Sequence, residues 1–285
     1  MIEVERVSFS YRTGEADAVP ALRELNLFIE PGQFVAIIGH NGSGKSTLVK
    51  LLTAILYPTE GEIRIGNIPV RQENQWEVRQ RVAVVFQDPD DQLVMNRVAD
   101  DVAFGPENLG VSREEISRRV DFALRALGLE DIGGRLIEDL SLGQKQRVAI
   151  AGALAMRPQF LILDEPSSLL PTPVARRLIS TIKDLNRHEG MGVLHITHSM
   201  SEAALFERVV VMDAGRVVLD GTPAQVFREV KQLRSIGLDV PLAASLAHAL
   251  RARGMPLEGD ILNEADLQIA IAAVKSSPAS TEPSG

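Results

Sequence analysis

The sequence predicts an α/β protein with a parallel sheet, and three observations support this. Short apolar runs typical of buried parallel strands occur at residues 34–38, 82–86 and 160–163, and a largely apolar one at residues 193–196. Between them lie segments with apolar residues at helical spacing, at residues 47–56, 98–136 and 174–188. A glycine-rich loop directly follows the first run. Strands that alternate with helices in this way form a parallel sheet with helices packed on it.

The two ends of the chain depart from this alternation. Apolar and polar residues alternate within residues 1–30, which predicts antiparallel strands around a loop rich in Gly, Ala and Asp. A short strand is expected at residues 62–65, and a final hairpin at residues 209–219 that turns at Ala214 and Gly215. Helical segments are expected at residues 242–252 and 264–274, before a polar, Pro- and Ser-rich tail that we expect to be disordered.

Composition limits the class of protein. The chain has 285 residues, enough for one large domain and an appendage. Its formal net charge of −8 argues against broad, nonspecific nucleic-acid binding. It contains no cysteine, which excludes disulfides and thiolate metal sites and fits a reducing compartment. We see no apolar stretch long enough to span a bilayer and no signal peptide, so we expect a soluble or peripheral protein.

The loop after the first predicted strand has the residues of a phosphate-binding loop, which are Gly39, His40, Asn41, Gly42, Ser43, Gly44, Lys45, Ser46 and Thr47. Its position between a strand and a helix is the setting this motif requires. The glycines let backbone N–H groups point at phosphate oxygens, and the helix N-terminus adds partial positive charge. Lys45 is expected to reach the β- and γ-phosphates of ATP, and the Ser46 hydroxyl to bind Mg²⁺. A chance match has a probability of roughly one per cent, which favours nucleotide binding over an incidental glycine turn.

Two carboxylates, Asp164 and Glu165, directly follow the apolar run at residues 160–163. In a parallel sheet this is the carboxyl end of a strand, beside the phosphate loop, where ligands bind. Asp164 is expected to hold Mg²⁺ directly or through water. Glu165 is expected to orient the attacking water, and it could also remove a proton from that water. Acidic residues at strand ends are common, so it is their order after a phosphate loop that makes this signal specific.

Gln87 and His198 end two other predicted strands. Gln87 could touch the Mg²⁺ shell and sense the γ-phosphate, and a polar strand cap is an equally supported alternative. His198 could donate a hydrogen bond to the γ-phosphate. A lone histidine at a strand end is usually structural, so the assignment of His198 depends on the other motifs.

Residues 140–147, with the sequence LSLGQKQR, resemble the signature motif of ABC-type ATPases, which normally reads LSGGQ. With the phosphate loop, Gln87, Asp164, Glu165 and His198 in the same order, the resemblance covers most of residues 1–222. It implies an ABC-type P-loop ATPase with a RecA-like core, an antiparallel β subdomain and a helical signature subdomain at about residues 88–156. Residues 223–274 would form a small C-terminal helical appendage, followed by a disordered tail at residues 275–285.

ABC-type ATPases work as head-to-tail dimers that enclose two ATP molecules, each between the phosphate loop of one subunit and the signature of the other. The resemblance therefore implies that Ser141, Gly143 and Gln144 contact the nucleotide bound by the opposite subunit. It also implies that Tyr11 stacks on adenine, and an ordinary strand aromatic is a credible alternative for Tyr11.

Further segments look like the ATPase subunits of energy-coupling factor (ECF) transporters, namely residues 85–92 (VFQDPDDQ), 100–108 (DDVAFGPEN), 235–241 (SIGLDVP) and 260–262 (DIL). This resemblance implies uptake of vitamins or transition-metal ions into a prokaryotic cell, powered from the cytoplasmic side of the cell membrane. The implied partners are a transmembrane coupling subunit, a second paralogous ATPase and exchangeable substrate-binding membrane proteins.

Three positions differ from the family pattern. Leu142 replaces a signature glycine. Glycine permits close backbone approach to phosphate and unusual φ/ψ, and leucine offers neither freely. Pro171 replaces an aspartate that normally meets the opposite subunit, and Ser199 replaces an aspartate after His198. Because the larger two changes lie in elements that reach across the dimer, we expect an asymmetric heterodimer. This chain would hydrolyse ATP at its own Lys45 and Glu165, and the site completed by Leu142 would be weaker.

Residues 93–95 (LVM) form an apolar patch suited to receiving a helix from the coupling subunit. Packing of the three side chains under the helical subdomain is at least as well supported. The appendage could stabilise the ATPase dimer, a role implied only by the resemblance.

Three other functions remain as alternatives. A regulatory subunit would bind ATP and hydrolyse little of it, but the intact Glu165 and His198 argue against this. A soluble ABC protein that acts on DNA or ribosomes is disfavoured by the single ATPase domain, the lack of a coiled-coil insertion and the negative charge. A P-loop kinase would leave the signature, Gln87 and His198 unexplained.

Overall fold

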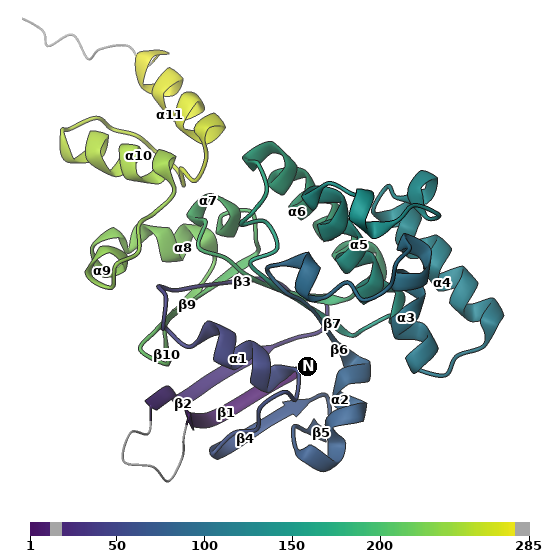
Figure 1. Cartoon of the computed structure of the whole chain (residues 1–285). Coiled ribbons are helices and arrows are strands. Elements are labelled where there is room, and N and C mark those ends of the chain that lie inside the picture. The colour runs from purple at the N-terminus through teal and green to yellow at the C-terminus, as the bar shows by residue number, and fades with distance from the viewer. Residues whose placement is uncertain (12–18, 277–285) are drawn as a thin grey trace, which may run out of the picture.

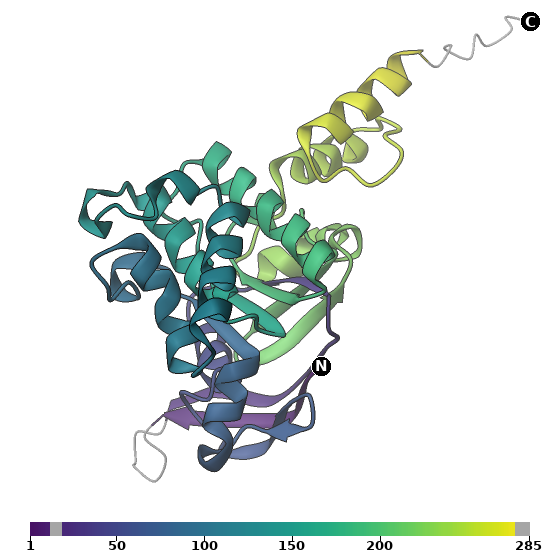
Figure 2. The same cartoon turned by 90° about the vertical axis from the view of Figure 1, so that its right-hand side faces the viewer.

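A computed structural model describes residues 1–11 and 19–276 of the chain. Its described part contains two sheets (Figures 1 and 2). The smaller sheet has the order β2-β1-β4-β5, with antiparallel pairing throughout. Its strands are β1 (Ile2–Tyr11), β2 (Val19–Ile29), β4 (Glu60–Ile65) and β5 (Ile68–Pro69).

The larger sheet has the order β10-β9-β3-β8-β7-β6. Five of its strands are parallel, and β10 pairs antiparallel to β9 at the edge. The strands are β3 (Phe34–Ile38), β6 (Val82–Val85), β7 (Phe160–Asp164), β8 (Gly192–Ile196), β9 (Arg208–Asp213) and β10 (Arg216–Gly221). Since β8 lies between β3 and β7, the strand of the phosphate loop does not pair with the strand of the two carboxylates.

Helices cover both faces of the larger sheet (Figure 1). The helix α1 (Lys45–Leu52) lies between the two sheets, and α2 (Gln75–Arg81) precedes β6. The opposite face carries α3 (Val98–Asn108), α4 (Arg113–Ala126), α5 (Leu142–Ala155) and α6 (Thr172–Glu189). A short helix, α7 (Met200–Ala203), follows β8.

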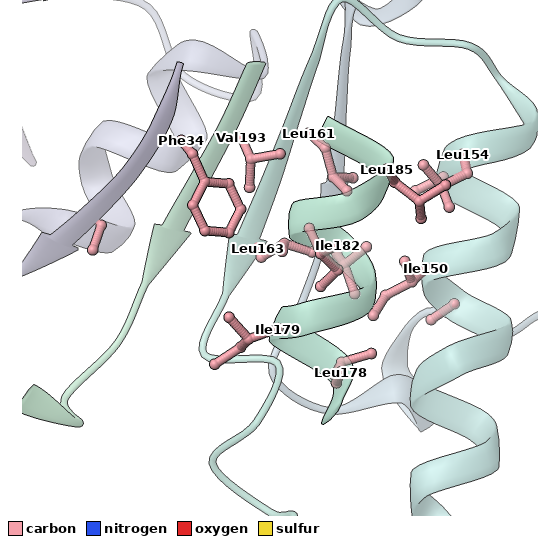
Figure 3. Close-up of a cluster of buried hydrophobic side chains, with 14 of the residues drawn as sticks. Phe34, Ile150, Leu154, Leu161, Leu163, Leu178, Ile179, Ile182, Leu185 and Val193 are labelled. Atoms are coloured by element: carbon pink, nitrogen blue, oxygen red, sulfur yellow. The ribbon is translucent and has the colours of Figure 1, made fainter. Parts of the chain in front are cut away.

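Alternate residues of β3 enter two different cores. Val35 and Ile37 pack with α1 and the antiparallel sheet, whereas Phe34, Ala36 and Ile38 pack with the helices of the opposite face. Both faces of the strand are therefore buried, which explains its uninterrupted apolar run. Figure 3 shows the second core, in which α6 side chains lie between those of the sheet and those of α5.

The C-terminal segment is helical and packs partly on itself. It contains α8 (Pro223–Arg228), α9 (Val230–Ser235), α10 (Leu242–Ala252) and α11 (Glu264–Ser276). The last two helices share a small apolar cluster separate from the two main cores, formed by Ala243, Ala247, Leu257, Ile261 and Ala270. Over residues 1–11 and 19–276, no helix is long and apolar enough to cross a bilayer.

The predicted strands and C-terminal helices are confirmed, with differences at element ends. The helix expected at residues 47–56 ends at Leu52, because Ala54 has a left-handed backbone (φ 52°). The helical region 98–136 is divided, with Gly110 (φ 68°) between its first two helices. The α2 helix was not predicted. The expected loop before Val19 and most of the expected disordered tail lie outside the described residues.

Candidate nucleotide-binding site

The phosphate loop connects the end of β3 to the start of α1, as its sequence predicts. Gly42 (φ 84°) and Gly44 (φ 103°) have left-handed backbones that other residues adopt only at a cost. The turn of the β9–β10 hairpin supports the loop, since the Gly215 N–H donates to the Ser43 carbonyl oxygen at 3.0 Å. The loop therefore has a fixed curvature before nucleotide is present.

Lys45 is buried, and its ammonium group folds back into the loop. Its Nζ donates to the carbonyl oxygens of Gly39 at 2.7 Å and His40 at 3.0 Å. Burial lowers the pKa of Lys45, and the charges of Glu165 and Asp164 partly offset this. Phosphate oxygens would be stronger acceptors for this cation than neutral carbonyls. Ser46, at the exposed start of α1, leaves its hydroxyl accessible to a ligand.

A contact that the sequence did not predict holds His40. Its Nε2 lies 2.7 Å from Oδ1 of Asp213, the last residue of β9, and its Nδ1 lies 2.6 Å from the Asn41 carbonyl oxygen. His40 was expected to contact nucleotide because of its place in the loop, yet its ring fastens the loop to a neighbouring strand. Asp213 is 173 residues away in sequence, and only the pairing of β3 with β9 brings the two together.

Asp164 and Glu165 stand at the carboxyl end of β7. Burial, with the adjacent charge of Glu165, raises the pKa of Asp164, while Lys45 and His198 act in the opposite direction. The fold thus disfavours the ionised form of Asp164. Glu165 has a left-handed backbone (φ 51°) that turns the chain sharply after the strand.

His198 follows β8, the neighbouring strand, and lies directly against Glu165. The Nε2 atom of His198 is 2.5 Å from Oε1 of Glu165. The imidazole and the carboxylate are therefore in direct contact. The candidate base and the candidate γ-phosphate donor are therefore brought together by the fold.

Gln87 lies in the segment after β6, and its side chain reaches the loop that follows Glu165. Its Nε2 donates to the Ser168 hydroxyl at 3.2 Å, and that hydroxyl donates to the Glu165 carbonyl oxygen at 2.9 Å. The side chain therefore bonds across to a second segment and does not cap its own strand.

Tyr11 ends β1 and lies over the start of α1. Its hydroxyl is 3.2 Å from Thr47 Oγ1, and its ring packs edge-to-face on Phe9 at 5.0 Å. About a third of the residue is exposed (36%). The ring is close enough to the phosphate loop to meet a base attached to bound phosphates.

The signature residues lie apart from all of these groups. Ser141, Gly143 and Gln144 are at the N-terminus of α5 and line an open cavity of about 710 Å³ between α5 and α6. No phosphate-loop residue lines this cavity. A single chain therefore keeps its signature away from its own phosphate loop.

The two main departures from the family pattern line this same cavity. Leu142 is the first residue of α5, so the leucine in this chain has a helical backbone and no unusual φ/ψ. The Ser141 N–H donates to Gln144 Oε1 at 2.9 Å, an N-terminal capping contact that fixes the start of the helix. Pro171 is the N-cap of α6, with φ −58° and ψ 142°, and its carbonyl accepts from Val174 and Ala175.

Ser199, the third departure, retains a function that aspartate would also perform. Its side chain accepts a hydrogen bond from the Glu202 N–H at 3.3 Å and so caps α7. Serine and aspartate are both favoured N-caps. This change therefore leaves the helix after His198 intact.

The acidic residues near the loop fit Mg²⁺ delivered with a nucleotide. Within the ranges described, no cluster of three or more His, Cys, Asp or Glu side chains could hold a metal ion alone. Mg²⁺ needs only one or two protein oxygen ligands when phosphate oxygens and water complete its shell. The Asp164 carboxylate, whose pKa is raised mainly by burial, and the Ser46 hydroxyl are suitable ligands.

The sequence matches the family described as "ABC transporter" over residues 22–168. A curated relative from Caldanaerobacter subterraneus subsp. tengcongensis, the energy-coupling factor transporter ATP-binding protein EcfA1, is 50% identical over 263 residues. That alignment covers 92% of this chain and 95% of the relative. This chain belongs to the ABC transporter family, among the ATP-binding proteins of ECF transporters. It is therefore an ATPase of the ABC type.

Other relatives support the same assignment. EcfA1 of Clostridioides difficile is 48% identical over 92% of this chain and 95% of its own length. The structure of CbiO1 from Clostridium perfringens, part of the transporter complex CbiONQ, matches with a TM-score of 0.75 and 36% identity over 87% of this chain and 98% of that one. A dimeric ATP-binding cassette bound to ADP and phosphate matches with a TM-score of 0.70 and 31% identity, over 78% and 99% of the two chains. The ABC ATPase fold predicted from the sequence is confirmed.

Proposed function

We propose that this chain hydrolyses ATP to power an ECF importer of vitamins or transition-metal ions, as one half of a head-to-tail ATPase heterodimer. The contact between Glu165 and His198 beside the Lys45 loop carries the catalytic part of this proposal, because it unites base and phosphate donor in one chain. The names of the relatives support the transport part. Residues 1–222 would be the ATPase domain and residues 223–274 an appendage.

In this proposal each side chain has a defined task in ATP hydrolysis. Lys45 Nζ exchanges its carbonyl acceptors for β- and γ-phosphate oxygens, and Tyr11 stacks on adenine. Glu165 orients the attacking water and accepts its proton as the water oxygen bonds to the γ-phosphorus and the β–γ bridge breaks. His198 donates from Nε2 to the γ-phosphate.

Mg²⁺ would be held by Ser46, Asp164 and the Gln87 amide oxygen, where it supplies positive charge to the phosphates. Hydrogen bonds link the Gln87 amide through the Ser168 hydroxyl to the Glu165 carbonyl oxygen. Through this link the Gln87 amide would respond to the presence of the γ-phosphate. Residues 88–95 follow directly, so the same segment connects the nucleotide to a membrane partner.

The contact with the transmembrane coupling subunit is assigned to the segment 93–95. Val94 is 61% exposed, whereas Leu93 packs against the main core, so the patch is only partly available. The Asp101 carboxylate fixes the backbone of this segment, because it accepts hydrogen bonds from the N–H groups of Val94 at 2.8 Å and Met95 at 2.9 Å. Such binding places the chain at the cytoplasmic face of the cell membrane, together with exchangeable substrate-binding subunits.

The heterodimer is supported by the position of the departures. Leu142 and Pro171 line one cavity, next to the signature residues that would complete the partner's site. The residues that act on this chain's own nucleotide are unchanged from the family pattern. A partner with a normal signature would therefore complete one fully active site.

The test is to purify the tagged chain from its host membranes in mild detergent, identify what co-purifies, and compare ATP turnover with Glu165→Gln. We expect a second ABC ATPase and a multi-span protein, and a loss of turnover of at least about 100-fold in the variant. Recovery of this chain alone from the soluble fraction would refute the transporter role. Equal turnover of wild type and variant in the complete complex would favour the regulatory alternative.

A further inference from the structure

One carboxylate on α7 accepts hydrogen bonds from both sides of the candidate catalytic pair. Oε2 of Glu202 accepts from the Ser167 hydroxyl at 2.7 Å and from the Thr197 hydroxyl at 3.0 Å. Ser167 lies two residues after Glu165, and Thr197 directly precedes His198. A single oxygen therefore joins the loop that follows the base to the loop that carries the histidine.

The imidazole of His195 is a third group in contact with the Glu202 carboxylate. His195 is fully buried, and its Nε2 lies 3.2 Å from the same Oε2. The ring stacks on Phe206 at 4.9 Å, and Phe206 stacks on Phe34 of the central strand at 4.0 Å. Nδ1 of His195 has no partner within the described part of the chain, so the neutral ring with its proton on Nε2 suits the site.

Glu202 is held as a carboxylate although it is mostly buried (13% side-chain exposure). Burial acts to raise the pKa of Glu202, but hydrogen bonds from His195, Ser167 and Thr197 together bring it below its usual value. A charged acceptor strengthens each of these bonds relative to a neutral one. The group is therefore suited to hold the two loops at a fixed separation.

We propose that Glu202 is a positioning residue for ATP hydrolysis, which sets the approach of His198 to Glu165 by tying the Ser167 and Thr197 hydroxyls to one oxygen. The Glu165 N–H also donates to the Ile196 carbonyl oxygen, at 3.0 Å. If the His198 Nε2–H turns from Glu165 to donate a hydrogen bond to a γ-phosphate, Glu202 would keep the histidine loop in place. This inference rests on the proposed ATPase role of the pair.

The decisive variant is Glu202→Gln, measured in the complete complex. It keeps an acceptor oxygen but removes the charge, and we expect kcat to fall roughly tenfold or more, while KM for ATP changes less than about twofold. Thr197→Val should cause a smaller loss in the same direction. The double variant should lose less than the sum of the two effects, because both act through one contact.

Glu115→Gln is a matched control on α4, far from the site. Glu115 is also partly buried (19% side-chain exposure) and has three partners, Arg118, Arg119 and Arg157. If the two variants lose turnover in proportion to their loss of thermal stability, Glu202 is only structural. An unchanged kcat in Glu202→Gln also overturns the proposal.

A second readout separates this inference from the proposed function. In the full-length isolated chain, the imidazole NMR signal of His198, assigned by its absence in His198→Gln, should shift in Glu202→Gln and not in Glu115→Gln. An unmoved His198 signal refutes the positioning role even if the complex hydrolyses no ATP. A moved signal with no ATP turnover by the wild type would instead refute the proposed function alone.

Discussion

Two regions of the molecule prepare for the same nucleotide chemistry in opposite ways. Around the phosphate loop, Lys45 already has a partner in the Gly39 carbonyl, and His198 has one in Glu165. Around the signature, Ser141 and Gly143 line an open cavity. The first region is built to exchange internal partners for a ligand, whereas the second is built to be completed from outside.

The pKa shifts of Lys45 and Asp164 support this description of the first region. Burial lowers the pKa of Lys45 and raises that of Asp164, so the fold disfavours the charged form of both groups. A Mg²⁺–nucleotide complex would compensate both charges of the first region, so ligand binding relieves a cost that the free chain carries.

The largest expected effect comes from removing the cation of the first region. Lys45→Ala should lower the affinity for ATP by roughly 100-fold, the value of one charge-assisted hydrogen bond of about 3 kcal/mol. Isothermal titration of the full-length chain with Mg²⁺–ATP measures this. Lys50→Ala, on the exposed side of the same helix, is the control. Similar affinities for all three proteins would show that the loop does not bind phosphate through Lys45.

A charge on the proposed membrane contact should separate transport from nucleotide binding. Val94→Asp places a carboxylate on a 61% exposed side chain, so we expect stability to change by less than about 0.5 kcal/mol. Binding to the transmembrane partner should fall about tenfold through desolvation of the new charge. Pull-down of the membrane complex and ATP titration are the two measurements.

Leu93→Asp is the contrasting variant for this test. Because Leu93 packs on the core, its replacement should reduce stability and ATP binding together. If Val94→Asp behaves in the same way, the segment is a packing element and not a docking surface.

Removing the partly buried Asp164 carboxylate should stabilise the free chain. Since the pKa of Asp164 is raised in the fold, its contribution disfavours folding as the pH rises above the pKa of the unfolded chain. At neutral pH we expect Asp164→Asn to raise the free energy of unfolding by up to about 1 kcal/mol, and to weaken stabilisation by Mg²⁺–ATP. Urea unfolding at pH 7 and near pH 4 tests the sign. A less stable variant at pH 7 would contradict the argument.

Local patterns predicted most of the fold and the first region. The run at Phe34–Ile38 is apolar because both faces of β3 are buried, and the loop after it needs glycine at two left-handed positions. Contacts between distant segments were not predictable, because they depend on strand order. The pair of His40 with Asp213 needs β9 beside β3, and the contact of His198 with Glu165 needs β8 beside β7.

The helical backbone at Leu142 had a signal in the sequence. Ser141 and Gln144 have the spacing of an N-terminal capping box, which places the intervening Leu142 in the first helical turn. The side chain, and not the backbone, is therefore what changes when glycine is replaced there. The Leu142 side chain lines the cavity beside the signature residues. The substitution therefore changes the space that this cavity leaves for a ligand.

The smallest expected effects come from restoring the family residues in the second region. Pro171→Asp provides the N-cap of α6 with a side-chain acceptor that proline lacks, so we expect a gain in stability of about 1 kcal/mol over Pro171→Ala. Leu142→Gly together with Pro171→Asp should raise turnover of the heterocomplex by about twofold if its two sites act independently. Phosphate release by the purified complex measures this gain. An increase in stability without any gain in turnover would mean that the two substitutions tune the fold of this chain and do not weaken the site it completes.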